Sequence, residues 1–212
     1  ATNDPEIGLL LPKPQENEQI NVRDAFCDLP RVEANEKNEV SVFLEKFTKY
    51  TQLMKDSSFW NMGNGSTKLT YHVAPNHRPG TLKRFKLINQ GEGLKDLFNK
   101  FSDAEIKKLQ EQRILPNKWY IQRNRRLVES RPSVTVTSHC LDELIHPTID
   151  RSITVREAAR LQGFPDCYDF IGGPFICPHM YETQDKYEQI GDAVPPLLAY
   201  AWGGVVKKII GV

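Results

Sequence analysis

Apolar side chains recur every three or four positions between residues 39 and 55, which predicts an amphipathic helix over that range. A second helix is predicted from Ser102 to about residue 113, because Ser102 and Glu105 have the spacing of a capping box. A third, over residues 196–210, has apolar side chains around most of its circumference. Such a helix needs burial on more than one side, which indicates that another subunit or domain covers it.

Shorter patterns predict the other elements. Residues 22–29 are typical of a short helical turn, with Asp24 and Asp28 as caps. Residues 1–21 are rich in proline and are interpreted as an extended linker. Strands are favoured by β-branched or alternating side chains in three segments, which are residues 68–73, 118–122 and 133–138.

The most distinctive string is RSITVREAARLQGFP, residues 151–165. Thr154 and Glu157 form another capping box, which predicts the start of a helix. Gly163 is followed by an aromatic residue and a proline, which predicts a left-handed C-cap and the end of the helix. The string therefore predicts a helix of about two to three turns with both ends specified by sequence.

Three arginines of this string, Arg151, Arg156 and Arg160, follow one another at intervals of five and four positions. A short amphipathic helix explains the two caps but does not explain the arginine series. Guanidinium groups at this spacing favour a helix that organises its surroundings through forked hydrogen bonds to carbonyl or carboxylate oxygens.

The chain has 212 residues, 39% of them hydrophobic, which suits one large or two small domains. Its four cysteines have no CxxC spacing, which argues against a disulfide framework and a structural zinc site. Cys167, Cys177 and His179 could hold a metal ion, but we favour buried or loop positions for them and predict no metal site. No signal peptide or membrane-length apolar run is present, so we expect a cytoplasmic protein without a membrane partner.

Positive charge is unevenly distributed along the chain. Residues 1–60 have a net charge of −4, and residues 61–212 have a net charge of +5. The highest density of positive charge lies in residues 118–131, which contain five basic residues and one acidic residue. Trp119, Tyr120 and Gln122 lie among the basic residues. Such donors and planar groups bind the phosphates and base edges of DNA. A solvated basic loop is the alternative interpretation.

The string RSITVREAARLQGFP resembles the ninth motif of the DNA cytosine-5 methyltransferases. QIGDAVPP, residues 189–196, resembles the tenth, with Asp192 where the family commonly has Asn. PSVTVTSH, residues 132–139, is similar to the strand that commonly precedes the ninth motif. Three upstream strings, VRDAFCDLP, HVAPNH and LKRFKLINQGEG, are similar to the region after the eighth motif. The whole chain thus resembles the C-terminal part of such an enzyme.

The resemblance implies a mixed α/β fold and three segments. Residues 1–30 would be a linker that enters from an absent catalytic portion. Residues 31–150 would be a small mixed α+β target-recognition domain. Residues 151–212 would contain the ninth and tenth motifs and the last helix, and would complete the C-terminal helical piece of a Rossmann-like methyltransferase domain.

The resemblance, together with the charge pattern, also implies roles for individual residues. The candidates for contact with DNA are Arg123, Arg125, Arg126, Arg131, Thr135 and Thr137. The candidates for one side of a site for S-adenosylmethionine are Gly191, Asp192, Ala193 and Val194. A structural role in bracing the recognition domain is expected for Arg151, Thr154, Arg156, Glu157 and Arg160.

No catalytic residue is predicted on this chain. The family uses a Cys thiolate that follows a proline, whereas the four cysteines here follow Phe26, His139, Asp166 and Ile176. The chain also has no Phe-x-Gly-x-Gly loop for the cofactor. The resemblance therefore implies that methyl transfer requires a catalytic domain or subunit, with double-stranded DNA as the other partner. The alternative is a free-standing DNA-binding or regulatory module derived from such an enzyme.

Overall fold

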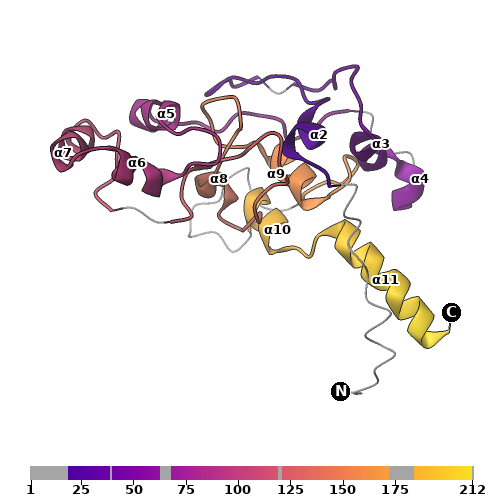
Figure 1. The fold of residues 1–212 in the computed structure, drawn as a ribbon. Coiled ribbons are helices and arrows are strands. Elements are labelled where there is room, and N and C mark those ends of the chain that lie inside the picture. Colours follow the sequence, from indigo (N-terminus) through magenta and orange to yellow (C-terminus); the bar gives the residue numbers. More distant parts are fainter. Residues whose placement is uncertain (1–18, 39, 63–67, 119–120, 172–183, 212) are drawn as a thin grey trace.

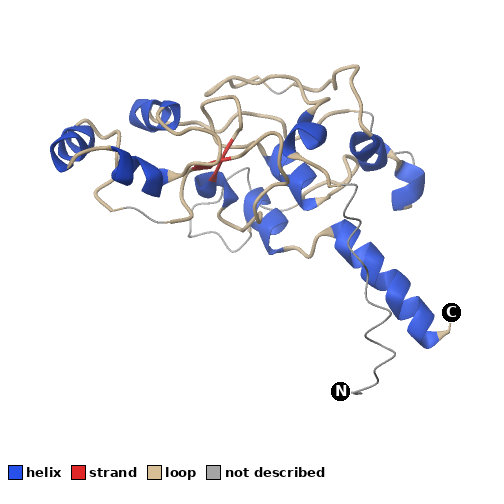
Figure 2. Ribbon diagram, viewed as in Figure 1, coloured by secondary structure: helices blue, strands red, loops and turns tan. Residues whose placement is uncertain are grey.

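The computed structural model describes residues 19–38, 40–62, 68–118, 121–171 and 184–211 (Figure 1). In these ranges the chain has a mixed α/β fold in which short helices are joined by long loops (Figure 2). A small parallel sheet pairs β1 (Arg125–Arg126) with β2 (Leu144–Ile145), and Arg125 lies opposite Leu144. No described helix is both long and apolar enough to cross a membrane.

The helices form two groups (Figure 1), and the described residues form three buried hydrophobic clusters. One group contains α2 (Val22–Phe26), α3 (Lys49–Lys55), α4 (Ser57–Trp60), α9 (Val155–Gln162) and α10 (Lys186–Asp192). The other contains α5 (Pro79–Lys86), α6 (Leu94–Lys100) and α7 (Asp103–Glu111). Strand β2 joins two of these clusters, because Leu144 belongs to the first hydrophobic cluster and Ile145 to the second. Successive residues of a strand face opposite sides, so one short strand serves both clusters.

Two further helices complete the described chain. The short helix α8 (Cys140–Glu143) leads directly into β2. Helix α11 (Pro196–Ile210) projects away from the two groups at the C-terminal end (Figure 1). Val205 is its one buried residue.

Several predicted helices are confirmed. Helix α9 begins with the capping box of Thr154 and Glu157 and ends at Gly163, which has φ +82°. Helices α2, α7 and α11 lie where the sequence predicts them. Asp24 does cap α2 together with Asn21.

The predicted helix over residues 39–55 is wrong for its first half. The helix begins only at Lys49, because Thr48 and Thr51 form a capping box. Before Thr48 the described chain is not helical, and the Leu44 N–H donates to the carbonyl oxygen of Asp28, beyond the end of α2, at 2.8 Å. Val42, Leu44 and Phe47 of this segment are exposed, so the apolar spacing here does not mark one buried helix face.

The predicted strands are also corrected. Residues 68–73 and 133–138 are irregular backbone. Residues 119 and 120, in the third predicted strand, lie outside the described residues, and residues 121 and 122 form a turn. β-branched side chains favoured these strands, but none of the described residues provides a neighbouring edge that pairs with them.

Helix α9 is buried on both faces. Its six residues from Val155 to Arg160 are all buried, and Arg151, Arg156 and Arg160 are each 0% exposed. The apolar side packs into the first core, as expected for an amphipathic helix. The arginine side, which the periodicity alone would place in solvent, is covered by acidic side chains and backbone carbonyls.

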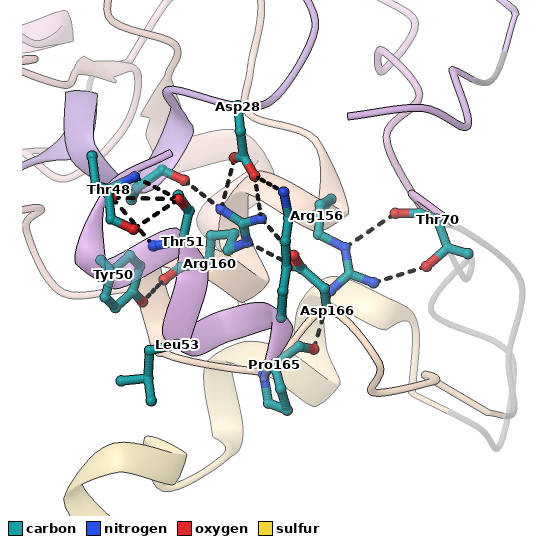
Figure 3. A network of polar contacts seen from close by, with 12 residues as sticks. Asp28, Thr48, Tyr50, Thr51, Leu53, Thr70, Arg156, Arg160, Pro165 and Asp166 are labelled. Atoms are coloured by element: carbon teal, nitrogen blue, oxygen red, sulfur yellow. Dashed lines mark hydrogen bonds and ion pairs between the residues drawn. The ribbon is translucent and has the colours of Figure 1, made fainter. Parts of the chain in front are cut away.

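Arg160 lies at the centre of a buried chain of alternating charges (Figure 3). Its Nε donates to Asp166 Oδ1 at 2.6 Å, and its Nη1 donates to Asp28 Oδ1 at 3.1 Å. Lys55 pairs with the outer side of Asp28, and Arg156 lies 3.6 Å from Asp166. With a bond from Nη1 to the Ala25 carbonyl and bonds from Nη2 to both carboxylates, all five guanidinium N–H groups of Arg160 are used.

Arg151 and Glu157 form a second buried ion pair. The two guanidinium nitrogens Nη1 and Nη2 donate to the two carboxylate oxygens, each at 2.7 Å. Glu157 Oε2 also accepts from the Thr154 N–H at 2.8 Å, so the same carboxylate closes the capping box. Burial alone would raise the pKa of Glu157, but the charge and hydrogen bonds of Arg151 outweigh it and hold that pKa well below its usual value. Glu157 is therefore ionised inside the protein.

Replacing Arg151 with Ala should destabilise the fold by about 3 to 5 kcal/mol, because it leaves the Glu157 carboxylate buried without its cation. The measurement is the free energy of unfolding from urea titration. Arg31→Ala is the control, since Arg31 forms an exposed ion pair with Glu33 and should cost at most about 1 kcal/mol. Equal stability of the two variants would contradict the bracing role of Arg151.

Candidate nucleic-acid interface

The two residues of strand β1, Arg125 and Arg126, are neighbouring arginines of the basic segment. Arg125 is exposed and Arg126 is 6% exposed, because successive strand residues face opposite sides. Arg126 donates to five oxygens, which are Ile88 O at 2.7 Å, His146 O at 2.9 Å, Ile149 O at 3.1 Å, Phe85 O at 2.7 Å and Asp150 Oδ1 at 2.7 Å. Every guanidinium N–H is used within the protein. The expectation that Arg126 contacts DNA is therefore corrected: it ties together the loops behind the surface.

Arg125 points to the other side and lines a surface depression of about 180 Å³. Gln122, Thr135 and Thr137 line the same depression, so the structure brings together candidates that lie up to fifteen positions apart in the sequence. The rest of the lining is Ile121, Val134, Glu143 and Leu144. We call this feature the Arg125 depression. It combines a guanidinium, an amide and a hydroxyl, which are the donors that contact phosphates and base edges.

The two threonines of the depression differ in how their hydroxyls are used. Thr137 Oγ1 donates to Glu143 Oε2 at 2.6 Å and accepts from the His139 N–H at 3.1 Å. It therefore stabilises the turn into α8. Thr135 is exposed, and its hydroxyl has no hydrogen bond to any part of the chain that the structure describes. Thr135 is thus the threonine with a hydroxyl available to a ligand.

The remaining candidates for DNA contact lie outside the lining of this depression. Arg123 is exposed and lies 3.3 Å from Asp142 Oδ2. Arg131 is exposed beside the start of α2, where its carbonyl accepts from the Val22 N–H at 3.0 Å. Trp119 and Tyr120 lie outside the described residues. Sequence reasoning missed Ile121, which is 68% exposed; an apolar residue flanked by polar ones gave no signal of its position.

The tenth-motif segment packs directly behind the Arg125 depression. A Cβ atom on Gly191 would lie 2.1 Å from the backbone carbon of Thr137 and 2.1 Å from the backbone nitrogen of Ser138. Real Cβ atoms never approach backbone so closely, so only glycine fits at this position of α10. The residue that the sequence associates with the cofactor therefore also supports the segment that carries the DNA candidates.

The turn that follows Gly191 is fixed from the inside and open on the outside. Gln162 Nε2 donates to the Ala193 carbonyl at 3.0 Å and to the Ile190 carbonyl at 3.3 Å. Asp192 and Val194 are exposed, and Asp192 Oδ2 accepts from Gln184 Nε2 at 2.7 Å. The turn can thus present an acceptor and an apolar side chain to a ligand.

Among the described residues, no cluster of three or more His, Cys, Asp or Glu side chains could hold a metal ion. Of the three residues that we considered as a metal cluster, Cys177 and His179 lie outside the described residues.

Comparison with known proteins gives consistent results. The model of the C-5 cytosine-specific DNA methylase family matches residues 13–208. The type II methyltransferase M.DdeI of Desulfomicrobium norvegicum is 34% identical over 88% of this chain and 42% of its own length. The type II methyltransferase M.AquIB of Picosynechococcus sp. is 36% identical over 65% of this chain and 86% of its own length. This chain therefore spans less than half of M.DdeI but most of M.AquIB.

A solved structure shows the same fold. It is a candidate DNA modification methyltransferase encoded within a prophage of Escherichia coli, and it superposes with a TM-score of 0.57 at 21% sequence identity. The likeness covers 97% of this chain and 53% of the solved one. The short helices and small sheet described above thus correspond to about half of a methyltransferase-type structure.

Replacing Gly191 with Ala should destabilise the fold by about 1 to 3 kcal/mol or more, because the new methyl group meets backbone that cannot rotate away. Gly203→Ala is a matched control within α11, where a Cβ would meet nothing within 4 Å. That variant should gain about 0.5 to 1 kcal/mol from helix propensity. Thermal unfolding of both variants measures the difference, and a stabilised Gly191→Ala variant would contradict the close packing.

Proposed function

This chain belongs to the C-5 cytosine-specific DNA methylase family, and we propose that it supplies the DNA-recognition part of a DNA (cytosine-5)-methyltransferase. The observation that carries the proposal is the Arg125 depression. There the exposed guanidinium of Arg125, the amide of Gln122 and the Thr135 hydroxyl, which has no hydrogen bond to a described residue, line the same hollow. Double-stranded DNA is the substrate that this donor set fits.

The donors suit different parts of a duplex. Arg125 can donate two parallel hydrogen bonds to a phosphate or to O6 and N7 of a guanine. Gln122 can form a paired contact with an adenine edge, and the Thr135 hydroxyl suits a phosphate oxygen. Thr135 lies two residues before Thr137, whose backbone rests on Gly191. The recognition surface is therefore supported by the segment with the tenth motif.

The nucleophile of the reaction comes from outside this chain in our proposal. No cysteine here follows a proline, as the family's catalytic cysteine does. Among the described cysteines, Cys140 is 0% exposed, and burial raises the pKa of its thiol to about 12. A thiol of that kind stays protonated at neutral pH and is a poor nucleophile. The catalytic thiolate and the main cofactor loop belong to the rest of the enzyme.

The turn at residues 191–194 would form one wall of the S-adenosylmethionine site. When bound, this cofactor supplies the methyl group. The exposed Val194 fits an apolar part of the ligand, and the Asp192 carboxylate fits a hydroxyl or amino donor. The bonds from Gln162 hold the turn in place, so this chain positions the wall before the ligand arrives.

Helix α11 would dock on the catalytic portion. Exposed along it are Leu198, Tyr200, Trp202, Val206, Ile209 and Ile210. So many large apolar side chains on one projecting helix are typical of an interaction surface. The same observation argues against the free-standing DNA-binding module, which would have to leave this surface in water.

Arg125→Ala should weaken binding of the chain to duplex DNA by about 1 to 3 kcal/mol, since one bidentate contact is lost. Fluorescence anisotropy with a random-sequence duplex measures the dissociation constant. Arg131→Ala is the matched control, because it removes the same charge from an exposed site outside the depression. Equal losses in the two variants would show that net charge and not the depression accounts for binding.

Trp202→Glu should abolish methyl transfer to DNA by a mixture of this chain and a polypeptide with the catalytic portion, because a charge is placed in the proposed interface. Methyl incorporation from labelled S-adenosylmethionine is the measurement. Lys207→Glu introduces the same carboxylate at an exposed, already charged position of α11 and should reduce transfer far less. Full activity of Trp202→Glu would contradict docking through this face.

A further inference from the structure

A second and larger hollow lies on the opposite group of helices. It has a volume of about 730 Å³ and is formed between the start of α5 and the segment that follows α7. Its lining contains three arginines, Arg78, Arg84 and Arg113, against the single carboxylate of Glu111. We call it the Arg84 hollow. None of its residues takes part in the recognition surface described above.

Close packing brings these arginines together. A Cβ atom on Gly80 would lie 2.2 Å from the Arg113 carbonyl oxygen, so α5 can approach the segment after α7 only because residue 80 is a glycine. Arg113 itself has φ +57°, a left-handed conformation that residues with a side chain rarely adopt. The tertiary packing that enforces both features also determines where the arginines meet.

Two of the three arginines of the hollow have no ion-pair partner among the described residues. Arg78 and Arg113 are exposed and form no ion pair with any described residue. Arg84 Nη1 donates to the Ile114 carbonyl at 3.1 Å, but no carboxylate binds this guanidinium. Its Nε is the one buried side-chain nitrogen or oxygen of the described residues that has no hydrogen-bond partner. A buried donor without a partner costs free energy, which indicates that the position of this guanidinium is set by the surrounding packing.

The start of α5 adds further donors to the same hollow. The N-cap residue is Arg78, and no side chain caps the helix. Pro79 occupies the first turn, and Gly80 and Thr81 line the hollow. Free backbone N–H groups at a helix start attract anions. They supplement the three guanidinium groups and do not by themselves define the site.

Arg123 and Asp142 lie near both hollows. The charges of Asp142 and Arg123 both act on Arg84, so these groups lie near the Arg84 hollow. Arg123 precedes Arg125 by two residues, and Glu143, next to Asp142, lines the Arg125 depression. The Arg125 depression and the Arg84 hollow therefore lie near each other, with the Arg123–Asp142 ion pair close to both.

We propose that the Arg84 hollow binds phosphates of the DNA backbone beside the recognised site. The inference rests on the proposed function and extends it, because it adds a contact without sequence preference next to the one that reads bases. Its volume accommodates a sugar–phosphate segment, and its donors match the non-bridging oxygens of phosphodiesters. Arg78 and Arg113 contribute charge at the rim, and Arg84 donates from the wall.

The test compares two double variants of the whole chain. Arg78→Ala/Arg113→Ala removes two charges from the hollow. Lys83→Ala/Lys86→Ala removes two exposed charges from α5 that lie outside the lining of the hollow. We expect the first variant to reduce the slope of log affinity against log salt by about 2 for a long duplex. The second should change the slope by much less. For a duplex too short to reach the hollow, both variants should bind like the parent chain.

Further measurements separate the possible failures. If Arg125→Ala weakens DNA binding but Arg78→Ala/Arg113→Ala does not, the backbone contact is refuted and the proposed function stands. If inorganic pyrophosphate at constant ionic strength raises the melting temperature only when Arg78 and Arg113 are present, while DNA affinity is unaffected by the double variant, the hollow takes a free phosphate ligand and the DNA proposal is refuted. If the parent chain binds neither DNA nor pyrophosphate, both the proposal and the function on which it rests are overturned.

Discussion

The fold depends on guanidinium groups that have been taken out of water. Arg160 lies between the carboxylates of Asp28 and Asp166, and Arg151 is clamped to Glu157, all within or beside one helix. Removing charges from water is costly, and their mutual attraction compensates only when the geometry leaves no donor or acceptor unused. Here the hydrogen bonds of both arginines reach segments more than a hundred positions away, such as Ala25 and Val32. Small helices with little sheet are thereby held in one arrangement.

Local signals in the sequence were sufficient where the backbone decides its own conformation. The caps at Thr154 and Gly163 predicted α9 to the residue, because each acts over three or four positions. The helix over residues 39–55 failed in its first half, where Val42 is 70% exposed and Phe47 is 72% exposed. Apolar periodicity alone does not show which side chains a fold will bury.

The candidate site could also be predicted from the sequence only in part. Charge density indicated the basic segment, yet it could not distinguish Arg125 from Arg126, since the direction of each side chain is fixed by pairing of β1 with β2. The sequence associated Gly191 with a cofactor, and nothing local revealed that its missing side chain lets the Thr137 backbone approach. The Arg84 hollow was not predicted at all, because its arginines are spread over 36 positions and meet only through the contact at Gly80.

Each of the buried arginines donates to at least one main-chain oxygen, and this affects how the amino-acid sequence can change in evolution. Arg126 donates to four main-chain carbonyls, and Arg151, Arg156 and Arg160 each donate to at least one. A main-chain oxygen is present whatever amino acid occupies the position. Loops such as the one that contains His146 and Ile149 can therefore exchange side chains while the arginines continue to hold their backbones. A frame of this kind lets the surface acquire new side chains without a new fold.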